Sequence, residues 1–155
     1  MHEISLHLRD ENETIALGKK IARVLRPGLV IHLEGELGAG KTALVRSMLK
    51  AMGHTGKVKS PTYALVELYT ISRLHLYHFD LYRFDNPEEW NDSGFREYFN
   101  PESICFVEWP ERGGKLLPEP DIRISLGFEG EGRHVEIDAI SEAGRQCVKR
   151  LKDGT

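Results

Sequence analysis

Residues 29–42 read LVIHLEGELGAGKT, and the fold class can be predicted from this stretch. Its second part, Gly35–Thr42, satisfies the pattern G-x-x-x-x-G-K-[ST] of a phosphate-binding loop, or P-loop. The apolar run Leu29–Leu33 before it is typical of a strand that is buried on both faces. The pattern after it predicts a helix from Lys41 to about Met52, which Gly53 ends. A strand, a glycine-rich turn and a helix in this order are the context that a P-loop requires.

A loop of this composition binds a nucleotide mainly through its backbone. The glycines allow N–H groups to turn toward the phosphates with no Cβ in the way. We expect Lys41 to place its charge against the β- and γ-phosphates and the Thr42 hydroxyl to bind Mg²⁺. The predicted ligands are therefore ATP or ADP with Mg²⁺. The loop residues expected at the nucleotide are Gly35, Gly38, Ala39, Gly40, Lys41, Thr42 and Ala43.

Two later apolar runs each end in an acid, LYHFD at Asp80 and ICFVE at Glu108. A P-loop enzyme needs an acid at the carboxyl end of a neighbouring strand to hold Mg²⁺, directly or through water. It also needs a group that orients or activates the attacking water. We expect Asp80 and Glu108 to perform these two tasks near Thr42, and the division of roles between the two carboxylates stays open.

A predicted hairpin of residues 63–69 and 74–79 brings another segment to the same place. If Asp80 lies beside the P-loop, the strand that ends in Asp80 runs parallel to the P-loop strand, and its hairpin partner runs the opposite way. Residues 53–62 must then return across the sheet, and ten extended residues reach ~33 Å, more than a strand of ~20 Å requires. We therefore expect Ser60-Pro61-Thr62 at the nucleotide, where a hydroxyl of this segment senses the γ-phosphate; the alternative is a plain turn that enters the strand.

The remaining segments complete an α/β pattern. On the helix expected between Asp10 and Arg26, we place Ile15, Ala22 and Leu25 on the buried face. We predict one domain, residues 1–155, with a three-layer P-loop NTPase-like fold: a mixed, mostly parallel sheet with helices on both faces and antiparallel hairpins. The other expected elements are a strand at residues 4–8, helix and loop at 86–99, a strand at 104–107, a hairpin of 122–128 and 134–140, and a helix after Ser141.

Composition excludes several classes of protein. Of the 155 residues, 40% are hydrophobic and 29% are charged, which is typical of a globular chain. No apolar run approaches the ~20 residues that span a bilayer, and the N-terminal residues lack the apolar segment of a signal peptide. Cys105 and Cys147 match no metal or disulfide spacing. We expect a cytoplasmic protein without a membrane anchor.

The net charge of −3 argues against a chain that binds nucleic acid electrostatically as a whole. Basic residues do gather around the P-loop helix and the loop after it. They form either a solvated face with a field suited to phosphates or a direct RNA-binding patch. These residues are Lys41, Arg46, Lys50, Lys57 and Lys59.

Over nearly its whole length the chain resembles the bacterial TsaE (YjeE) family. The resemblance lies in GELGAGKT at 35–42, VKSPTYALVELY at 58–69, YHFDLYRFDNPEE at 77–89 and FVEWPE at 106–111. It implies a P-loop ATPase needed to make threonylcarbamoyladenosine next to the anticodon of certain tRNAs. It also implies work with the TsaB–TsaD complex, while TsaC makes the threonylcarbamoyl-adenylate. We expect a monomer when alone, contacting tRNA only indirectly, through TsaB–TsaD.

The resemblance also implies roles for particular residues. Lys41 and Thr42 would bind phosphate and Mg²⁺, and Asp80 and Glu108 would serve the metal and the water. Ala43 departs from the second Thr or Ser usual in the family, which predicts modestly weaker nucleotide binding. The further residues implied are Thr62 as a switch-type residue, Trp109 close to the nucleotide, and Glu11, Gly132 and Arg133 reaching the bound nucleotide.

Two other functions stay open from the sequence: a P-loop kinase acting on a small molecule, and a nucleotide-dependent switch with little hydrolysis of its own. The kinase lacks support because no Arg-rich lid segment is present, and a GTPase is disfavoured by the absence of an Asn-Lys-x-Asp segment. His75 and His78 should point to opposite faces of their strand, so we treat both as ordinary residues and not as a metal pair.

Overall fold

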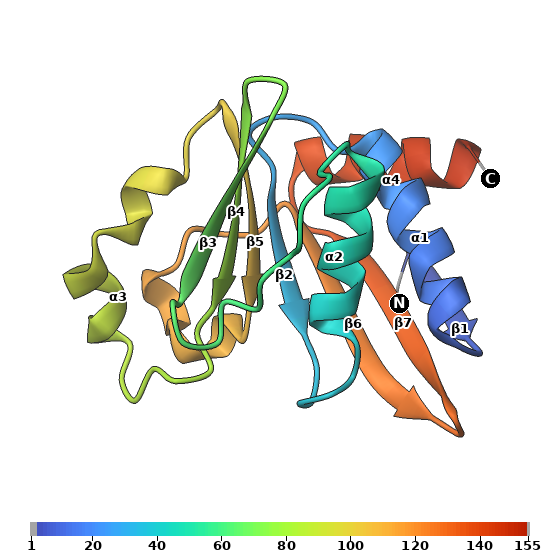
Figure 1. Ribbon diagram of the computed structural model, residues 1–155, viewed down its shortest axis with the longest axis horizontal. Coiled ribbons are helices and arrows are strands. Elements are labelled where there is room, and N and C mark those ends of the chain that lie inside the picture. Colours follow the sequence, from blue (N-terminus) through green and yellow to red (C-terminus); the bar gives the residue numbers. More distant parts are fainter. Residues whose placement is uncertain (1–2, 155) are drawn as a thin grey trace.

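A seven-stranded sheet in the order β1-β7-β6-β2-β5-β4-β3 forms the centre of the computed structural model, which describes residues 3–154 (Figure 1). The pairs β6–β2, β2–β5 and β5–β4 are parallel, whereas β1–β7, β7–β6 and β4–β3 are antiparallel. Only β3 and β7 run against the other strands, so the sheet is mostly parallel, as predicted. The strands are Ile4–Leu8 (β1), Val30–Glu34 (β2), Val66–Ile71 (β3), Leu74–Asp80 (β4), Ser103–Glu108 (β5), Ile122–Glu129 (β6) and Gly132–Ala139 (β7).

Helices cover both faces of this sheet, which confirms the three-layer prediction, but the two coverings differ. One face carries the long helices α1 (Glu11–Val24), α2 (Lys41–Ala51) and α4 (Glu142–Asp153). The opposite face carries only short elements, packed over β4 and β5 around Phe79 and Trp90. These are α3 (Glu88–Ser93) and the 3₁₀ turns η1 (Phe95–Tyr98), η2 (Pro110–Arg112) and η3 (Gly114–Leu116). Among the described residues, no helix is long and apolar enough to cross a membrane.

Strand direction and register bring the predicted site residues to one edge. The strands β2, β4 and β5 run parallel, so their carboxyl ends lie together. In the register, Glu108 is paired with Leu33 on one side and with Asp80 on the other. The P-loop follows β2 directly, and β3 runs opposite to β4. The predicted topology is therefore confirmed.

The buried face of α1 differs from the prediction. Ile15 is 37% exposed, whereas the buried residues are Thr14, Leu17, Gly18, Ile21 and Val24. The reason is close packing of α1 on α2: a Cβ at Gly18 would lie 1.8 Å from Ser47 Oγ. Small residues thus define this contact. Of the predicted buried face, Leu25 is buried and Ala22 is partly buried, whereas the placement of Ile15 was wrong. The helix also ends at Val24, two residues before the expected Arg26.

Both hairpins have tighter turns than expected. Only Ser72 and Arg73 separate β3 from β4, with φ values of 50° and 70° that suit a two-residue turn. Strand β3 begins at Val66 and not at Tyr63, because Leu65 has a φ of 71° and breaks the extended run.

The predicted helix starts are close to the observed ones, since Asp10 and Ser141 each accept a backbone N–H as N-caps.

Candidate nucleotide and metal site

The P-loop runs from the end of β2 into α2, and its glycines are required by its geometry. Gly35 has a φ of 144°, and a Cβ there would lie 2.3 Å from the Leu126 carbonyl oxygen of β6. Gly40 precedes α2 with a φ of 106°, in the left-handed region that favours glycine. No side chain caps α2 and no acid lies in its first turn, so the positive end of its dipole is not neutralised there.

Lys41 lies inward at this loop, with only 4% of its surface exposed. Its Nζ donates to the Gly35 carbonyl oxygen and lies 3.7 Å from the centre of the Trp109 ring, a cation–π contact. Burial lowers the pKa of Lys41, and the nearby carboxylates of Glu108, Glu111 and Asp80 oppose that shift. The P-loop cation therefore shares one site with the predicted acids.

The two carboxylates lie side by side and are almost fully buried, with Asp80 6% and Glu108 2% exposed. Thr42 Oγ1 donates to Glu108 Oε2 at 2.8 Å, and Asp80 Oδ1 accepts the backbone N–H of Tyr82 at 2.9 Å. Burial raises the pKa of Asp80, and the charge of Glu108 adds to this shift, while Tyr82 N–H, His78 and Lys41 oppose it. Two carboxylates and a hydroxyl form an all-oxygen donor set, which fits Mg²⁺.

His78 belongs to this cluster, although the sequence analysis treated it as ordinary. Its Nε2 lies 2.5 Å from Glu108 Oε2, and both side chains are buried. The prediction that His75 and His78 point to opposite faces is confirmed, since His75 is exposed. A signal for His78 was nevertheless present, because it lies two residues before Asp80 and so shares its face.

Trp109 lies at the edge of the site, as predicted, and is half-buried beneath Lys41. Its backbone adopts φ 57° and ψ 49°, so a bulky residue occupies the left-handed region directly after β5. The Tyr82 ring lies 4.9 Å from the Trp109 ring, and the Arg112 guanidinium lies 5.3 Å from the Tyr82 ring. The sequence analysis identified neither Tyr82 nor Arg112. No periodic pattern marks them, because Tyr82 lies in the turn after β4 and Arg112 ends the short 3₁₀ turn η2.

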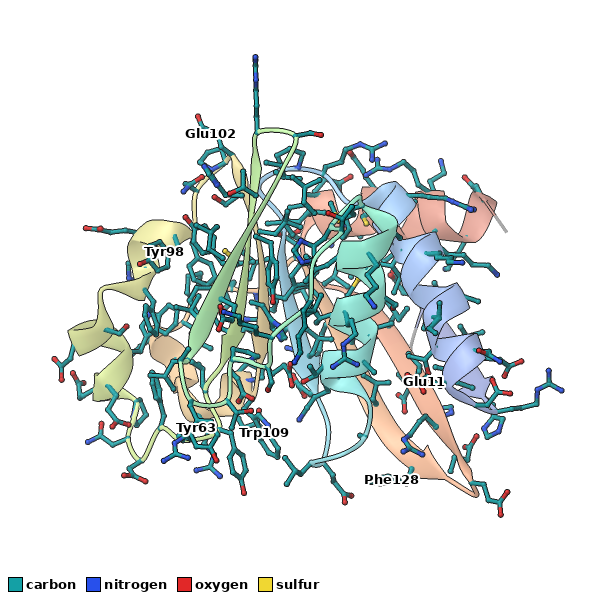
Figure 2. All side chains as sticks on the ribbon, in the orientation of Figure 1. Glu11, Tyr63, Tyr98, Glu102, Trp109 and Phe128 are labelled. Carbon is teal, nitrogen blue, oxygen red and sulfur yellow. The ribbon has the colours of Figure 1, made fainter. Side chains whose placement is uncertain are left out.

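The segment that contains Thr62 returns to this edge. Asp80 N donates to the Leu65 carbonyl at 2.9 Å, and Leu65 N donates to the Pro61 carbonyl at 2.7 Å. The return is anchored by the Tyr69 hydroxyl, which bonds both the N–H and the carbonyl of Lys59. The Thr62 hydroxyl pairs with Ser60 at 2.7 Å and not with the two carboxylates. Figure 2 shows the next residue, Tyr63, at the same edge as Trp109.

The remaining predicted residues lie around the P-loop in different ways. Arg133 Nε donates to the Ala39 carbonyl at 3.2 Å, and its Nη2 donates to the Gly38 carbonyl at 3.3 Å. Its guanidinium also lies 4.5 Å from the ring of Phe128, an exposed aromatic residue that the sequence analysis missed. Arg133 thus supports the loop from outside.

Gly132 has a packing role in the structure, since a Cβ there would lie 2.2 Å from the Leu8 carbonyl oxygen. Glu11 is exposed at the start of α1, and Figure 2 shows it well apart from Trp109 in this view. Ala43 is half-buried in the first turn of α2. Of the basic residues near α2, Lys41 alone is buried in the site, while Lys50, Lys57 and Lys59 are exposed.

Comparison with known proteins identifies the family to which the chain belongs. Residues 8–135 match the family described as threonylcarbamoyl adenosine biosynthesis protein TsaE. The tRNA threonylcarbamoyladenosine biosynthesis protein TsaE of Haemophilus influenzae is 42% identical, over 99% of this chain and 100% of the relative. The protein of the same name from Bacillus subtilis is 35% identical over 97% of this chain and 95% of its own length. The crystal structure of Bacillus subtilis YdiB matches with a TM-score of 0.85 at 28% identity, covering 99% of this chain and 97% of that one.

Proposed function

Because the chain belongs to the TsaE family of tRNA threonylcarbamoyladenosine biosynthesis proteins, we propose that it is the Mg²⁺-dependent ATPase of that modification. One observation carries the proposal: the P-loop hydroxyl of Thr42 donates to the buried carboxylate of Glu108, with Asp80 as its neighbour in the register. One edge of the sheet thus carries the start of the P-loop helix, a cation and two acids. This combination suits phosphoryl transfer from a nucleotide.

The loop residues supply the binding. The backbone N–H groups of residues 35–42 and the start of α2 would hold the phosphates of ATP. Lys41 exchanges its contact with the Gly35 carbonyl for the phosphates, whose charge is a stronger partner than a neutral carbonyl. Thr42 and Glu108 would hold Mg²⁺, which neutralises phosphate charge when bound, with Asp80 beside Glu108 in the register. Arg133 keeps the outer side of the loop in place through its bonds to Gly38 and Ala39.

The two carboxylates differ in ways that suit different tasks. Glu108 accepts from Thr42, the residue that reaches the metal, so Glu108 is placed to hold the ion. Asp80 has its pKa raised by burial, which makes it a better proton acceptor than an exposed aspartate. We propose that Asp80 orients the attacking water.

We propose that the segment of residues 59–65 reports the nucleotide state. Both ends of the segment are held by hydrogen bonds. The Tyr69 hydroxyl bonds Lys59 at one end, and the Leu65 carbonyl accepts the Asp80 N–H at the other. Thr62 lies within the segment, and its hydroxyl bonds the exposed Ser60 side chain, a contact that can be exchanged for a ligand. We propose that Thr62 is the residue through which the γ-phosphate changes this segment.

The partner is proposed to be a TsaB–TsaD complex in the cytoplasm, to which this chain docks as a monomer and through which it acts on tRNA. The test is to purify the chain with TsaB–TsaD in ATP, in ADP and without nucleotide, and to measure threonylcarbamoyl-adenosine formation with TsaC and tRNA. We expect docking to differ between nucleotides and repeated modification to require the chain, because a switch needs different affinities in its two states. Equal docking in ATP, in ADP and without nucleotide would contradict the proposed switch. Repeated modification of tRNA without the chain would contradict its proposed role in the modification.

A further inference from the structure

We propose that His78 is the positioning residue for Glu108, holding its carboxylate in the one orientation that leaves an oxygen for the metal. This inference rests on the proposed ATPase function. His78 comes from β4 and Glu108 from β5, so two adjacent parallel strands fix the two backbones relative to each other. Nothing in the P-loop pattern requires a histidine at this place.

The contact is short and buried. His78 Nε2 lies 2.5 Å from Glu108 Oε2, with the side chains 1% and 3% exposed. A carboxylate shielded from water must receive hydrogen bonds from the protein to remain ionised at low cost. Thr42 provides one such bond and His78 provides the other, and both end on Oε2. The second oxygen, Oε1, carries neither bond.

Because both hydrogen bonds end on the same oxygen, His78 can orient the carboxylate of Glu108, which packing of the ring alone would not do. The last torsion of a glutamate is broad, so a rotamer preference does not fix the plane of the carboxylate. Two donors that converge on one oxygen do fix it. Thr42 is also expected to bind Mg²⁺, so its hydroxyl cannot be relied on as the sole support of Glu108 once the metal is bound. His78 is then the donor that keeps the carboxylate in place.

The protonation of the ring follows from its surroundings. Among the described residues, His78 Nδ1 has no hydrogen-bond partner, whereas Nε2 faces a carboxylate that can only accept. The proton therefore belongs on Nε2, and the ring acts as a fixed donor. This tautomer can be measured in the wild-type protein by imidazole ¹⁵N chemical shifts, with no nucleotide present. We expect an Nε2–H form, and a bare Nε2 would overturn the proposal.

Three substitutions separate the hydrogen bond from the volume of the ring. His78→Gln can place an N–H near the Nε2 position, His78→Asn is too short to do so, and His78→Phe fills the space without a donor. Outer-shell partners of metal ligands typically change metal affinity or activity by about 10–100-fold. We expect losses of this size in kcat and in the Mg²⁺ dependence of labelled-ADP affinity for His78→Asn and His78→Phe. His78→Gln should stay within about threefold of the wild type.

A double-mutant cycle with Glu108→Gln tests whether His78 acts through Glu108. If it does, adding His78→Phe to Glu108→Gln should cause almost no further loss, because the supported group is already gone. ADP affinity in EDTA should be unchanged in every His78 variant, and unfolding curves identify any variant that fails to fold.

Three outcomes would overturn the inference. His78→Phe could keep wild-type kcat and Mg²⁺ dependence, His78→Gln and His78→Phe could fall together, or the loss could persist in full in Glu108→Gln. Full turnover in Glu108→Gln alone would remove the role of His78, and full turnover in both Glu108→Gln and Asp80→Asn would mean that the proposed function fails.

Discussion

At the scale of single residues, Glu108 and Asp80 have different hydrogen-bond partners, so substitutions at these two positions can distinguish nucleotide binding from hydrolysis. Glu108 and Asp80 lie next to each other, yet Glu108 is bonded to Thr42 and His78 while Asp80 is bonded to the Tyr82 backbone. We therefore expect a change at Glu108 to disturb Thr42 and His78 at the proposed metal site, and a change at Asp80 to leave these two residues in place. The two carboxylates can be tested with substitutions that keep shape and remove charge.

For Glu108→Gln we expect nucleotide binding to survive and hydrolysis to fall by at least about 100-fold, since the charge at the metal is lost. Asp80→Asn should also reduce hydrolysis, through the water and not through Mg²⁺ affinity. Titration of labelled ADP and phosphate release, each across a Mg²⁺ series, measure the two effects. Full turnover in Glu108→Gln together with an inactive Asp80→Asn would mean that Asp80 holds the metal and Glu108 orients the water.

Asp80→Asn also has a predicted effect on stability. The pKa of Asp80 is raised in the folded protein, mainly by burial, so the ionised form opposes folding at neutral pH. This penalty is present above the folded-state pKa and disappears as the pH falls below the unfolded-state value. Asp80→Asn should therefore raise the melting temperature at pH 7, and its advantage should shrink toward pH 3. An advantage that grows on acidification would contradict the assignment.

Trp109 offers an optical measurement of the same site. Its ring lies 3.7 Å from Lys41 Nζ, whereas the other tryptophan, Trp90, is 1% exposed in the core of the opposite face. Since Lys41 must change partner when phosphate binds, adding ADP with Mg²⁺ should change tryptophan fluorescence. Trp109→Phe should remove most of the change and Trp90→Phe should preserve it. An unchanged response in Trp109→Phe would exclude Trp109 from the site.

At the level of elements, α1 and α2 depend on close contact between small residues. A Cβ at Gly18 would lie 1.8 Å from Ser47 Oγ and 3.3 Å from Met48 N, so the helices would have to separate. Gly18→Ala should destabilise the fold by about 1–3 kcal/mol, although alanine is otherwise the better helix residue. Urea unfolding measures this, and Gly127→Ala is a matched control because nothing lies within 4 Å of its added Cβ. Equal effects at both positions would show that the contact does not matter.

Elements with a local signal could be predicted from the sequence, and those set by packing could not. The P-loop, the strand ends at Asp80 and Glu108 and both hairpins follow from local patterns, and the structure has them. The buried face of α1 failed because Gly18 packs on a residue 29 positions away in sequence, Ser47. The roles of His78 and Arg133 depend on strand pairing and on a loop that approaches from another strand. The alternation along the strand places His78 on the same face as Asp80, but the partners of His78 and Arg133 are distant in sequence and cannot be read from neighbouring residues.

At the level of the whole molecule, the fold gathers the chemistry at one edge of the sheet. Strand β2 delivers the P-loop, β4 and β5 deliver the two acids, and the β6–β7 hairpin delivers Arg133 to the back of the loop. The segment before β3 returns to the same edge and bonds Asp80 through Leu65. A site built from four separate strands would connect a bound nucleotide to several surfaces, which suits the proposed action through a partner.

The central claim is that this edge hydrolyses ATP, and phosphate release measures it most directly. Purified chain should release phosphate from ATP in a Mg²⁺-dependent reaction that is slow alone and faster with TsaB–TsaD. Lys41→Ala should reduce the release to background, because it removes the P-loop cation aimed at the phosphates. Undiminished release by Lys41→Ala, or no release by the wild type under either condition, would contradict the account.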